Sequence, residues 1–230
     1  MNYRVTFIKA GCITTALICI FNFQMARAQV KDAGLWTSLA IEAKLVKKLS
    51  LNVSQEYRFN ENVTELGTWI SEAGLEYKLN KHVKASVNYR YTMKRQTNNL
   101  YSPRHRLFID VKAEKKIKPF IFQFRTRFQQ EYADIGRASD GGFAGYYSRN
   151  KFNLKFDLDR KWEPYFSIEL FSPLHRDQPF VFDDIRYSAG FEFALSKHHK
   201  LDLYYMIQKE MNVNDPVTDF IGGIGYQFKL

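Results

Sequence analysis

Five arginine residues are the strongest candidates for chemistry in this sequence. In two segments the arginines are two residues apart, so they share one face of an extended strand. Guanidinium groups side by side repel one another unless an acid or an anionic ligand lies among them, and their forked geometry suits carboxylates and phosphates. The sequence therefore predicts an anion-binding site formed by Arg104, Arg106, Arg125, Arg127 and Arg149.

A specific strand pairing would bring these arginines together. If the strands on either side of Lys116 pair about that turn, Arg106 lies near Arg127, and Arg104 lies near residues 129–131. Arg149, in the third segment, then lies close to the same end of the strands. We expect a basic vestibule on the loop side of a lumen, where small anions are admitted or held.

A serine and a histidine near the same boundary allow a different chemistry. Ser102, His105 and Ser148 lie close to the expected loop end, and His105 shares parity with the outward Leu107 and Ile109. A serine activated by this histidine at the outer leaflet could attack an ester. No acid is fixed to orient the histidine, and a histidine at the membrane interface is the commoner explanation. Lipid hydrolysis is therefore the alternative function, and we assign no catalytic residue, metal ligand or cofactor.

These side chains are positioned by segments in which apolar and polar residues alternate. Leu49, Leu51 and Val53, for example, alternate with Ser50 and Asn52. Period-two alternation gives a strand one apolar face and one polar face, and no segment carries a comparable pattern at helical spacing. The sequence therefore predicts an all-β chain, with strands near residues 35–45, 49–59, 68–79, 83–93, 104–114, 119–132, 146–158, 163–171, 185–195, 200–210 and 217–230.

The connections between these segments alternate in length. Transmembrane barrels have this asymmetry, with short periplasmic turns and longer extracellular loops, and segments of about ten residues can cross a bilayer when tilted. The fold class we predict is an antiparallel up-and-down transmembrane β-barrel. Short basic turns at 46–48, 80–82, 115–118, 159–161 and 196–199 alternate with longer polar connections at 60–67, 94–103, 133–145, 172–184 and 211–216.

A soluble sandwich or a lipocalin-like barrel is the alternative arrangement of such strands. It would place the apolar face inside and the charged face in water. The apolar face, however, is crowded with Phe, Tyr and Leu, which would need a very large packed interior. With the faces reversed, the apolar band meets lipid, the charges fill a lumen, and closure removes strand edges that lipid cannot hydrogen-bond. The pattern therefore favours the membrane barrel.

The number of strands is harder to predict. The sequence contains eleven alternating segments, whereas bacterial single-chain barrels normally have an even number of strands. Either Gln29–Gly34 contributes to a twelfth crossing, or one long segment is split, or the N-terminal residues thread the lumen. We predict about twelve strands, within a range of ten to twelve.

Residues 1–28 have the features of a cleaved secretory signal peptide. They contain a basic start, an apolar core and a small-x-small cleavage site at residues 26–28. We therefore predict a signal peptide at 1–28 and an outer-membrane barrel at 29–230, in the cell outer membrane of a diderm bacterium. Both cysteines, Cys12 and Cys19, lie in the leader, so the barrel would have no thiol for a disulfide, a metal site or a nucleophile.

The charges of the chain indicate its partners. The full sequence has a net charge of +10, but its basic residues alternate with apolar ones, so no nucleic-acid partner is expected. Basic turns and loops would face outer-membrane lipid and lipopolysaccharide, and the final alternating strand would be read by the barrel-assembly machinery. Inward basic and acidic groups nearly balance, so two alternatives remain: a small pore for an anionic solute, and a closed structural barrel.

Five stretches of the sequence carry a resemblance to a known family: GLWTS at 34–38, QEYRFN at 55–60, RHR at 104–106, ELF at 169–171 and DFIGGIGY at 219–226. They resemble the domain of unknown function 2490 family of bacterial outer-membrane β-barrel proteins. The likeness spans essentially all of the chain after the leader. It implies an outer-membrane barrel and supplies no activity for any residue.

Overall fold

The computed structural model describes residues 31–133, 144–158, 161–174 and 181–230. The expected signal peptide and both cysteines lie outside the described residues. Within the described ranges, no helix could cross a membrane. The strands found there are β1 (Lys31–Val46), β2 (Leu49–Asn60), β3 (Glu65–Lys78), β4 (Val83–Arg95), β5 (Tyr101–Ile117), β6 (Phe120–Ala133), β7 (Ala144–Phe156), β8 (Trp162–Pro173), β9 (Asp184–Ala194), β10 (His199–Glu210) and β11 (Thr218–Lys229).

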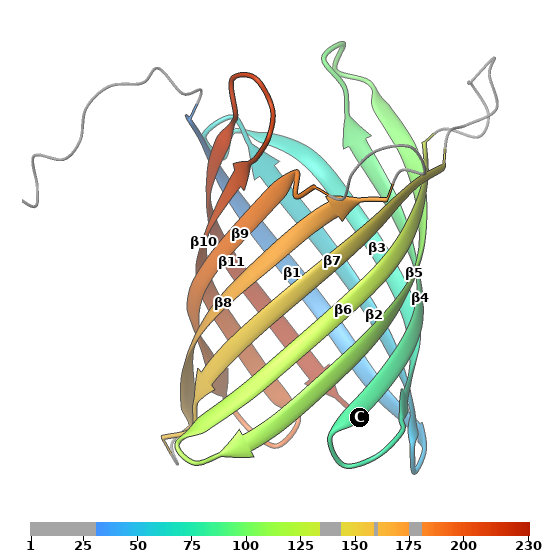
Figure 1. Ribbon diagram of the computed structural model, residues 1–230, viewed down its shortest axis with the longest axis vertical. Helices are drawn as coiled ribbons and strands as arrows, with labels where there is room; N and C mark the ends of the chain where they lie inside the picture. The colour runs from blue at the N-terminus through green and yellow to red at the C-terminus, as the bar shows by residue number, and fades with distance from the viewer. Residues whose placement is uncertain (1–30, 134–143, 159–160, 175–180) are drawn as a thin grey trace, which may run out of the picture. The chain divides into compact units, whose positions relative to one another are not determined.

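The strands form one closed barrel in chain order (Figure 1). Each strand pairs antiparallel with the next, and the barrel is closed by β1 and β11, which run parallel from Lys31↔Thr218 to Glu42↔Lys229. The described part of the chain contains eleven strands, which lies within the expected range but is one fewer than the preferred twelve. Gly34 belongs to β1 and does not contribute to a separate crossing.

The two ends of the barrel differ in their connections. Short turns follow β1, β3, β5, β7 and β9 at one end, which we call the turn end (Figure 1). The connections after β2, β4, β6, β8 and β10 leave the other end, the loop end. Since the strand number is odd, β1 begins at the loop end and β11 finishes at the turn end. The predicted alternation of the two ends is confirmed.

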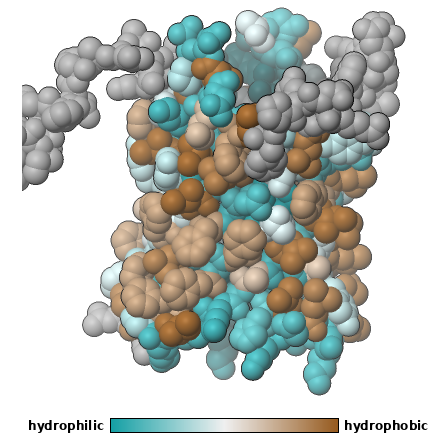
Figure 2. All heavy atoms as spheres, in the orientation of Figure 1, coloured by the Kyte–Doolittle hydropathy of each residue, from teal (hydrophilic) through white to brown (hydrophobic). Residues whose placement is uncertain are grey.

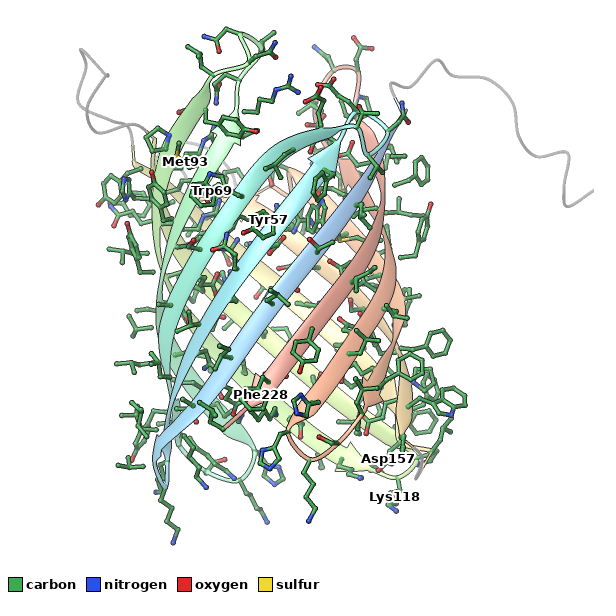
Figure 3. All side chains as sticks on the ribbon, turned by 180° about the vertical axis from the view of Figure 1, so that it is seen from behind. Tyr57, Trp69, Met93, Lys118, Asp157 and Phe228 are labelled. Atoms are coloured by element: carbon green, nitrogen blue, oxygen red, sulfur yellow. The ribbon has the colours of Figure 1, made fainter. Side chains whose placement is uncertain are left out.

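Apolar side chains make up much of the outer face of the barrel, as the side drawn in Figure 2 shows. Val87, Leu107 and Phe128 are examples, with exposed fractions of 61%, 49% and 56%. Near the loop end, Trp69 pairs with Tyr57 on one side and with Met93 on the other, and all three side chains project from the wall (Figure 3). The period-two pattern therefore gives an outer surface that is apolar and rich in aromatic rings.

The inner face is polar. Among the described residues, the buried set contains fourteen polar or charged side chains and only five hydrophobic ones. Ser167 and Ser172 are the most deeply buried, each with 1% exposed. A soluble β-barrel would bury its apolar faces instead. The faces are therefore oriented as in the predicted membrane barrel, with charge inside and apolar surface outside.

The pairing of β5 with β6 differs from the expected register. The turn lies at residues 118–119 and is not centred on Lys116. As a result, Arg127 lies opposite Asp110 and four residues away from the position opposite Arg106, so the expected Arg106–Arg127 neighbour pair is wrong. A four-residue shift keeps every side chain on its face but replaces a like-charge pair with an opposite-charge pair, which is the more favourable cross-strand contact.

Candidate functional site

Four neighbouring strands, β4 to β7, present basic side chains to the lumen at adjoining positions. The alternation of each strand places these residues on the inner face, and the register brings them level with one another. We call this set the cationic wall. It consists of three directly facing pairs of like charge, which are Arg90 with Arg106, Arg125 with Lys151, and Arg127 with Arg149.

Glu169 on β8 is the carboxylate beside this wall. Its Oε1 accepts hydrogen bonds from Arg149 Nε at 3.0 Å and from Arg125 Nη2. In register, Glu169 also lies between Lys151 on β7 and Arg186 on β9. One carboxylate is therefore surrounded by four cations, so this part of the lumen keeps a positive excess.

Other lumen carboxylates also bridge two cations. Glu131 accepts from Arg106 Nε at 2.9 Å and from Arg104 Nη1 at 3.2 Å. Arg104 lies opposite Ala133 and not opposite residue 129 as the expected register would place it, but its side chain still reaches Glu131. Such bridging offsets repulsion between neighbouring cations, because each carboxylate attracts both. The two remaining bridges are Glu76 with Lys84 and Lys112, and Glu192 with Lys155 and Lys200.

Aromatic rings inside the lumen hold several of the arginines in place. The guanidinium carbon of Arg58 lies 3.6 Å from the ring centre of Trp36. Arg186 lies between two rings, 5.3 Å from Trp36 and 4.4 Å from Phe171, and Arg149 is 4.3 Å from the same phenylalanine. Cation–π contacts of this kind fix a guanidinium without neutralising its charge.

The wall opposite the arginines carries tyrosines and glycines. Tyr204 on β10 lies directly between Gly190 on β9 and Gly223 on β11. A Cβ atom at Gly223 would overlap the Tyr204 ring, so the ring lies against the backbone of β11. Tyr165 donates a hydrogen bond to Asp202 Oδ1 at 3.1 Å. The tyrosines of this wall and the arginines of the cationic wall line a common cavity, which lies between them.

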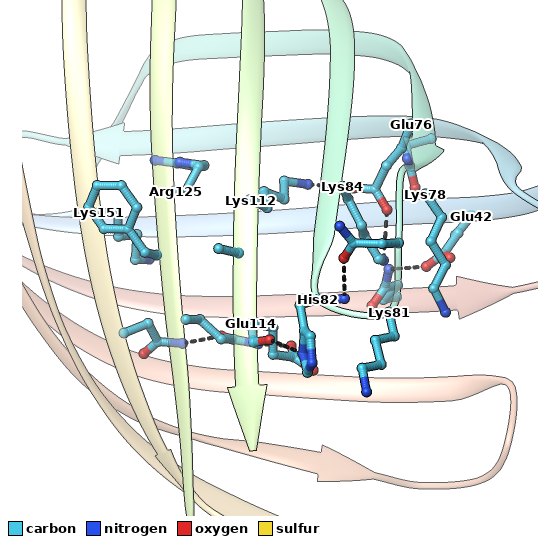
Figure 4. A pocket seen from close by; sticks show the side chains of 17 residues that line it. Glu42, Glu76, Lys78, Lys81, His82, Lys84, Lys112, Glu114, Arg125 and Lys151 are labelled. Carbon is cyan, nitrogen blue, oxygen red and sulfur yellow. Dashed lines mark hydrogen bonds and ion pairs between the residues drawn. The ribbon is translucent and has the colours of Figure 1, made fainter. Parts of the chain in front are cut away.

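The lumen contains several cavities, and three of them follow one another along its length. The loop-side cavity is about 360 Å³, the central cavity about 300 Å³ and the turn-side cavity about 470 Å³ (Figure 4 shows the last). Trp36, Arg58 and Arg186 line both the loop-side and the central cavity. Arg125 and Lys151 line both the central and the turn-side cavity. The cavities therefore meet at two junctions, each bordered by cations.

The structure separates the five arginines that the sequence predicts as a site. Arg125, Arg127 and Arg149 line the central cavity together. Arg104 and Arg106 lie toward the loop end, where they hold Glu131, and they line none of these three cavities.

Sequence reasoning did not assign three cations of the loop-side cavity, Arg58, Lys94 and Arg186, to the site. Lys94 lies near the end of β4, in a stretch expected to be a long connection. Continuing the alternation from Arg90 by two steps of two residues would have placed it on the inner face. The signal was present, but the expected strand stopped one residue too early.

The residues of the alternative lipid hydrolase are not assembled. Ser102 and His105 are three residues apart in β5, so their side chains lie on opposite faces of the strand. His105 Nδ1 lies 2.6 Å from the Tyr89 hydroxyl, and Ser148 Oγ accepts from Asn150 at 3.3 Å. In the part of the chain that the structure describes, no serine bonds this histidine, and no group of three His, Asp or Glu side chains could hold a metal ion.

Comparisons with known proteins place the chain in a family. No curated protein matches it. The beta domain of the Bordetella autotransporter Brka is 11% identical, over 76% of this chain and 81% of that chain, with a TM-score of 0.44. The NanC porin is 10% identical, over 76% of this chain and 85% of that chain, with a TM-score of 0.48. The model of the family described as protein of unknown function (DUF2490) matches residues 33–218, and the chain belongs to that family.

Proposed function

We propose that the barrel spans the outer membrane of a diderm bacterium and that its lumen is a path for small anionic solutes. The location rests on the two faces of the strands. Apolar side chains such as Val87 and Phe128 face outward, whereas the buried side chains are mostly polar. A closed barrel leaves no unpaired strand edge, and the shortest strand has 11 residues, enough to cross a bilayer when tilted.

The single observation that carries the anionic path is the charge excess around the central cavity. A lumen lined mainly by one sign of charge concentrates ions of the opposite sign, and low-dielectric walls strengthen the effect. The cavity lies in the middle of three that run from the loop end to the turn end. Its lining contains seven cations (Arg58, Arg90, Arg125, Arg127, Arg149, Lys151 and Arg186) and three acids (Glu56, Glu169 and Asp202). Two further acids, Glu72 and Asp110, pair with Arg90 and Arg127 beside the lining, so the cations still outnumber the acids.

From a location in the outer membrane we also infer the partners of the outer surface of the barrel. Lys47, Lys81, Lys115 and Lys197 are exposed at the turn end, where they would meet lipid phosphates of the inner leaflet. Lipopolysaccharide would surround the loop end, and the barrel-assembly machinery would insert the chain. None of these partners requires a catalytic residue, and we assign the barrel no enzymatic activity.

A planar bilayer experiment tests the anionic path. The mature chain is refolded, its β-structure is verified by circular dichroism, and single-channel currents are recorded under a KCl gradient. We expect discrete conductance steps and a reversal potential that reports preference for chloride over potassium. A folded protein that gives no steps would be a closed structural barrel, and a preference for potassium would contradict a cationic lumen.

A further inference from the structure

The cations of the lumen fall into two groups. One group is held in ion pairs, as Arg149 is by Glu169 and Lys112 is by Glu76. The second group has no ion-pair partner among the described residues, although its members lie on strands and line the three cavities. We call these the unpaired cations, and they are Lys78, Lys94, Lys151 and Arg186.

Arg186 is unpaired because the carboxylate that faces it on the adjacent strand is already occupied. It lies opposite Glu169 in register, but that carboxylate is bound by Arg149 and Arg125. Arg186 Nε donates instead to the neutral Gln208 Oε1 at 2.9 Å. Its guanidinium therefore keeps its full charge while the aromatic rings on either side hold its plane.

Lys151 lies at the junction of the central and the turn-side cavity, and it too faces a carboxylate that other cations already bind. It lies opposite Arg125 on one side and Glu169 on the other, so its only cross-strand acid is shared by two arginines. Neither a hydrogen bond nor an ion pair fixes its ammonium group within the described chain. Lys151 therefore adds positive charge to the lumen that no directly bonded carboxylate offsets.

The unpaired cations are distributed along the whole lumen. Lys94 lines the loop-side cavity, and Arg186 lines the loop-side and the central cavity. Lys151 lines the central and the turn-side cavity, and Lys78 lines the turn-side cavity near its mouth. An anion that moves from one end to the other would therefore meet one unpaired cation at each mouth and one at each junction.

We propose that these four cations are the transfer sites of the anionic path, and that the ion-paired cations serve only to hold the barrel together. This inference rests on the proposed function. Conduction needs sites that attract the ion but release it, and several weak sites in series meet both conditions. A paired cation attracts little, because its carboxylate offsets its charge. The guanidinium fork of Arg186 suits carboxylates and phosphates, so the solute class is small carboxylate- or phosphate-bearing anions.

The test compares two substitutions that change the net charge of the lumen equally. Lys151→Gln removes an unpaired cation, and Lys112→Gln removes a paired one from the lining of the same turn-side cavity. We expect Lys151→Gln and Arg186→Gln each to lower the chloride-to-potassium permeability ratio by about threefold or more. For Lys112→Gln we expect a decrease in this ratio of less than about 1.5-fold. Equal effects of the two lysine substitutions would overturn the assignment.

A second measurement uses inorganic phosphate as a blocker of the chloride current. Arg186→Lys keeps the charge but loses the fork, so we expect the permeability ratio to be retained and the blocking concentration of phosphate to rise several-fold. An unchanged blocking concentration would contradict the role of the fork. If the unsubstituted barrel conducts without anion preference, the proposed function itself fails. If it prefers anions but all three glutamine variants behave alike, only the assignment of transfer sites fails.

Discussion

Arg127 holds Asp110 through both ends of its guanidinium, with Nε donating to Oδ1 at 2.6 Å and Nη2 to Oδ2 at 2.8 Å. The two side chains are only 6% and 4% exposed, and the guanidinium carbon lies 3.7 Å from the ring centre of Phe108. This is the most deeply buried ion pair among the described residues, and it joins β5 to β6. It therefore belongs to the part of the lumen that stabilises the barrel.

Removing the acid of this pair should destabilise the barrel strongly. Asp110→Ala leaves a buried guanidinium without a counter-charge, and we expect a loss of about 3 kcal/mol in the free energy of unfolding. Equilibrium unfolding in urea from lipid vesicles measures the change. The double variant Asp110→Asn, Arg127→Gln is the control, and it should recover most of the loss. An Asp110→Ala barrel as stable as the unsubstituted one would contradict this role.

Removing Glu169, the shared carboxylate beside the cationic wall, should make stability depend on salt. Glu169→Gln leaves Arg125, Arg149, Lys151 and Arg186 without the acid among them, so their mutual repulsion is no longer offset. Because salt screens that repulsion, we expect the variant to unfold at a clearly lower temperature at about 0.02 M than at about 0.5 M NaCl. Thermal unfolding followed by circular dichroism at both concentrations measures this. The unsubstituted barrel should show a smaller difference.

The two glycines beside Tyr204 should respond differently to an added methyl group. At Gly190 a Cβ would lie 2.5 Å from the backbone oxygen of Leu203, so Gly190→Ala should destabilise the barrel by about 1–3 kcal/mol. At Gly223 its nearest neighbours would be atoms at the far end of the Tyr204 ring, which can move. Gly223→Ala should therefore move the ring into the lumen and lower the single-channel conductance, with a smaller effect on unfolding. Equal losses of stability would argue against this difference.

A charge on the outer face should be costly if that face meets lipid. Val87 is 61% exposed and lies between the outward Leu75 and Ile109. In a bilayer, Val87→Arg should lower the free energy of unfolding by about 2–4 kcal/mol, whereas on a surface in water it would change little. Unfolding from lipid vesicles measures the loss, and Val87→Leu is the control of similar size. An arginine variant as stable as the leucine variant would contradict the membrane location.

The strands could be predicted from the sequence because period-two alternation depends only on neighbouring residues. The segment expected at 49–59, for example, is β2 at Leu49–Asn60, and the segment at 200–210 is β10 at His199–Glu210. The loop-end boundaries were less accurate, because β4 and β5 extend beyond the expected 83–93 and 104–114. Strand ends there are set by pairing with the adjacent strand, which a single segment does not encode.

The division into paired and unpaired cations could not be predicted. It depends first on register, and a four-residue difference between β5 and β6 changed the partner of Arg127 from Arg106 to Asp110. The division also depends on ion pairs between strands that are not adjacent in the barrel. Lys112 on β5 reaches Glu76 on β3, and in the same way Lys155 on β7 reaches Glu192 on β9. Long side chains make such contacts only because the closed barrel is narrow, which is a property of the complete fold.

The parallel contact between β1 and β11 also separates the two ends of the barrel chain. Because the described chain contains eleven strands and closes with a parallel pair, β1 begins at the loop end and β11 finishes at the turn end. A tag fused before Lys31 would therefore report on one end of the barrel, and a tag fused after Lys229 would report on the other. In a barrel with an even number of strands, both tags would lie at the same end.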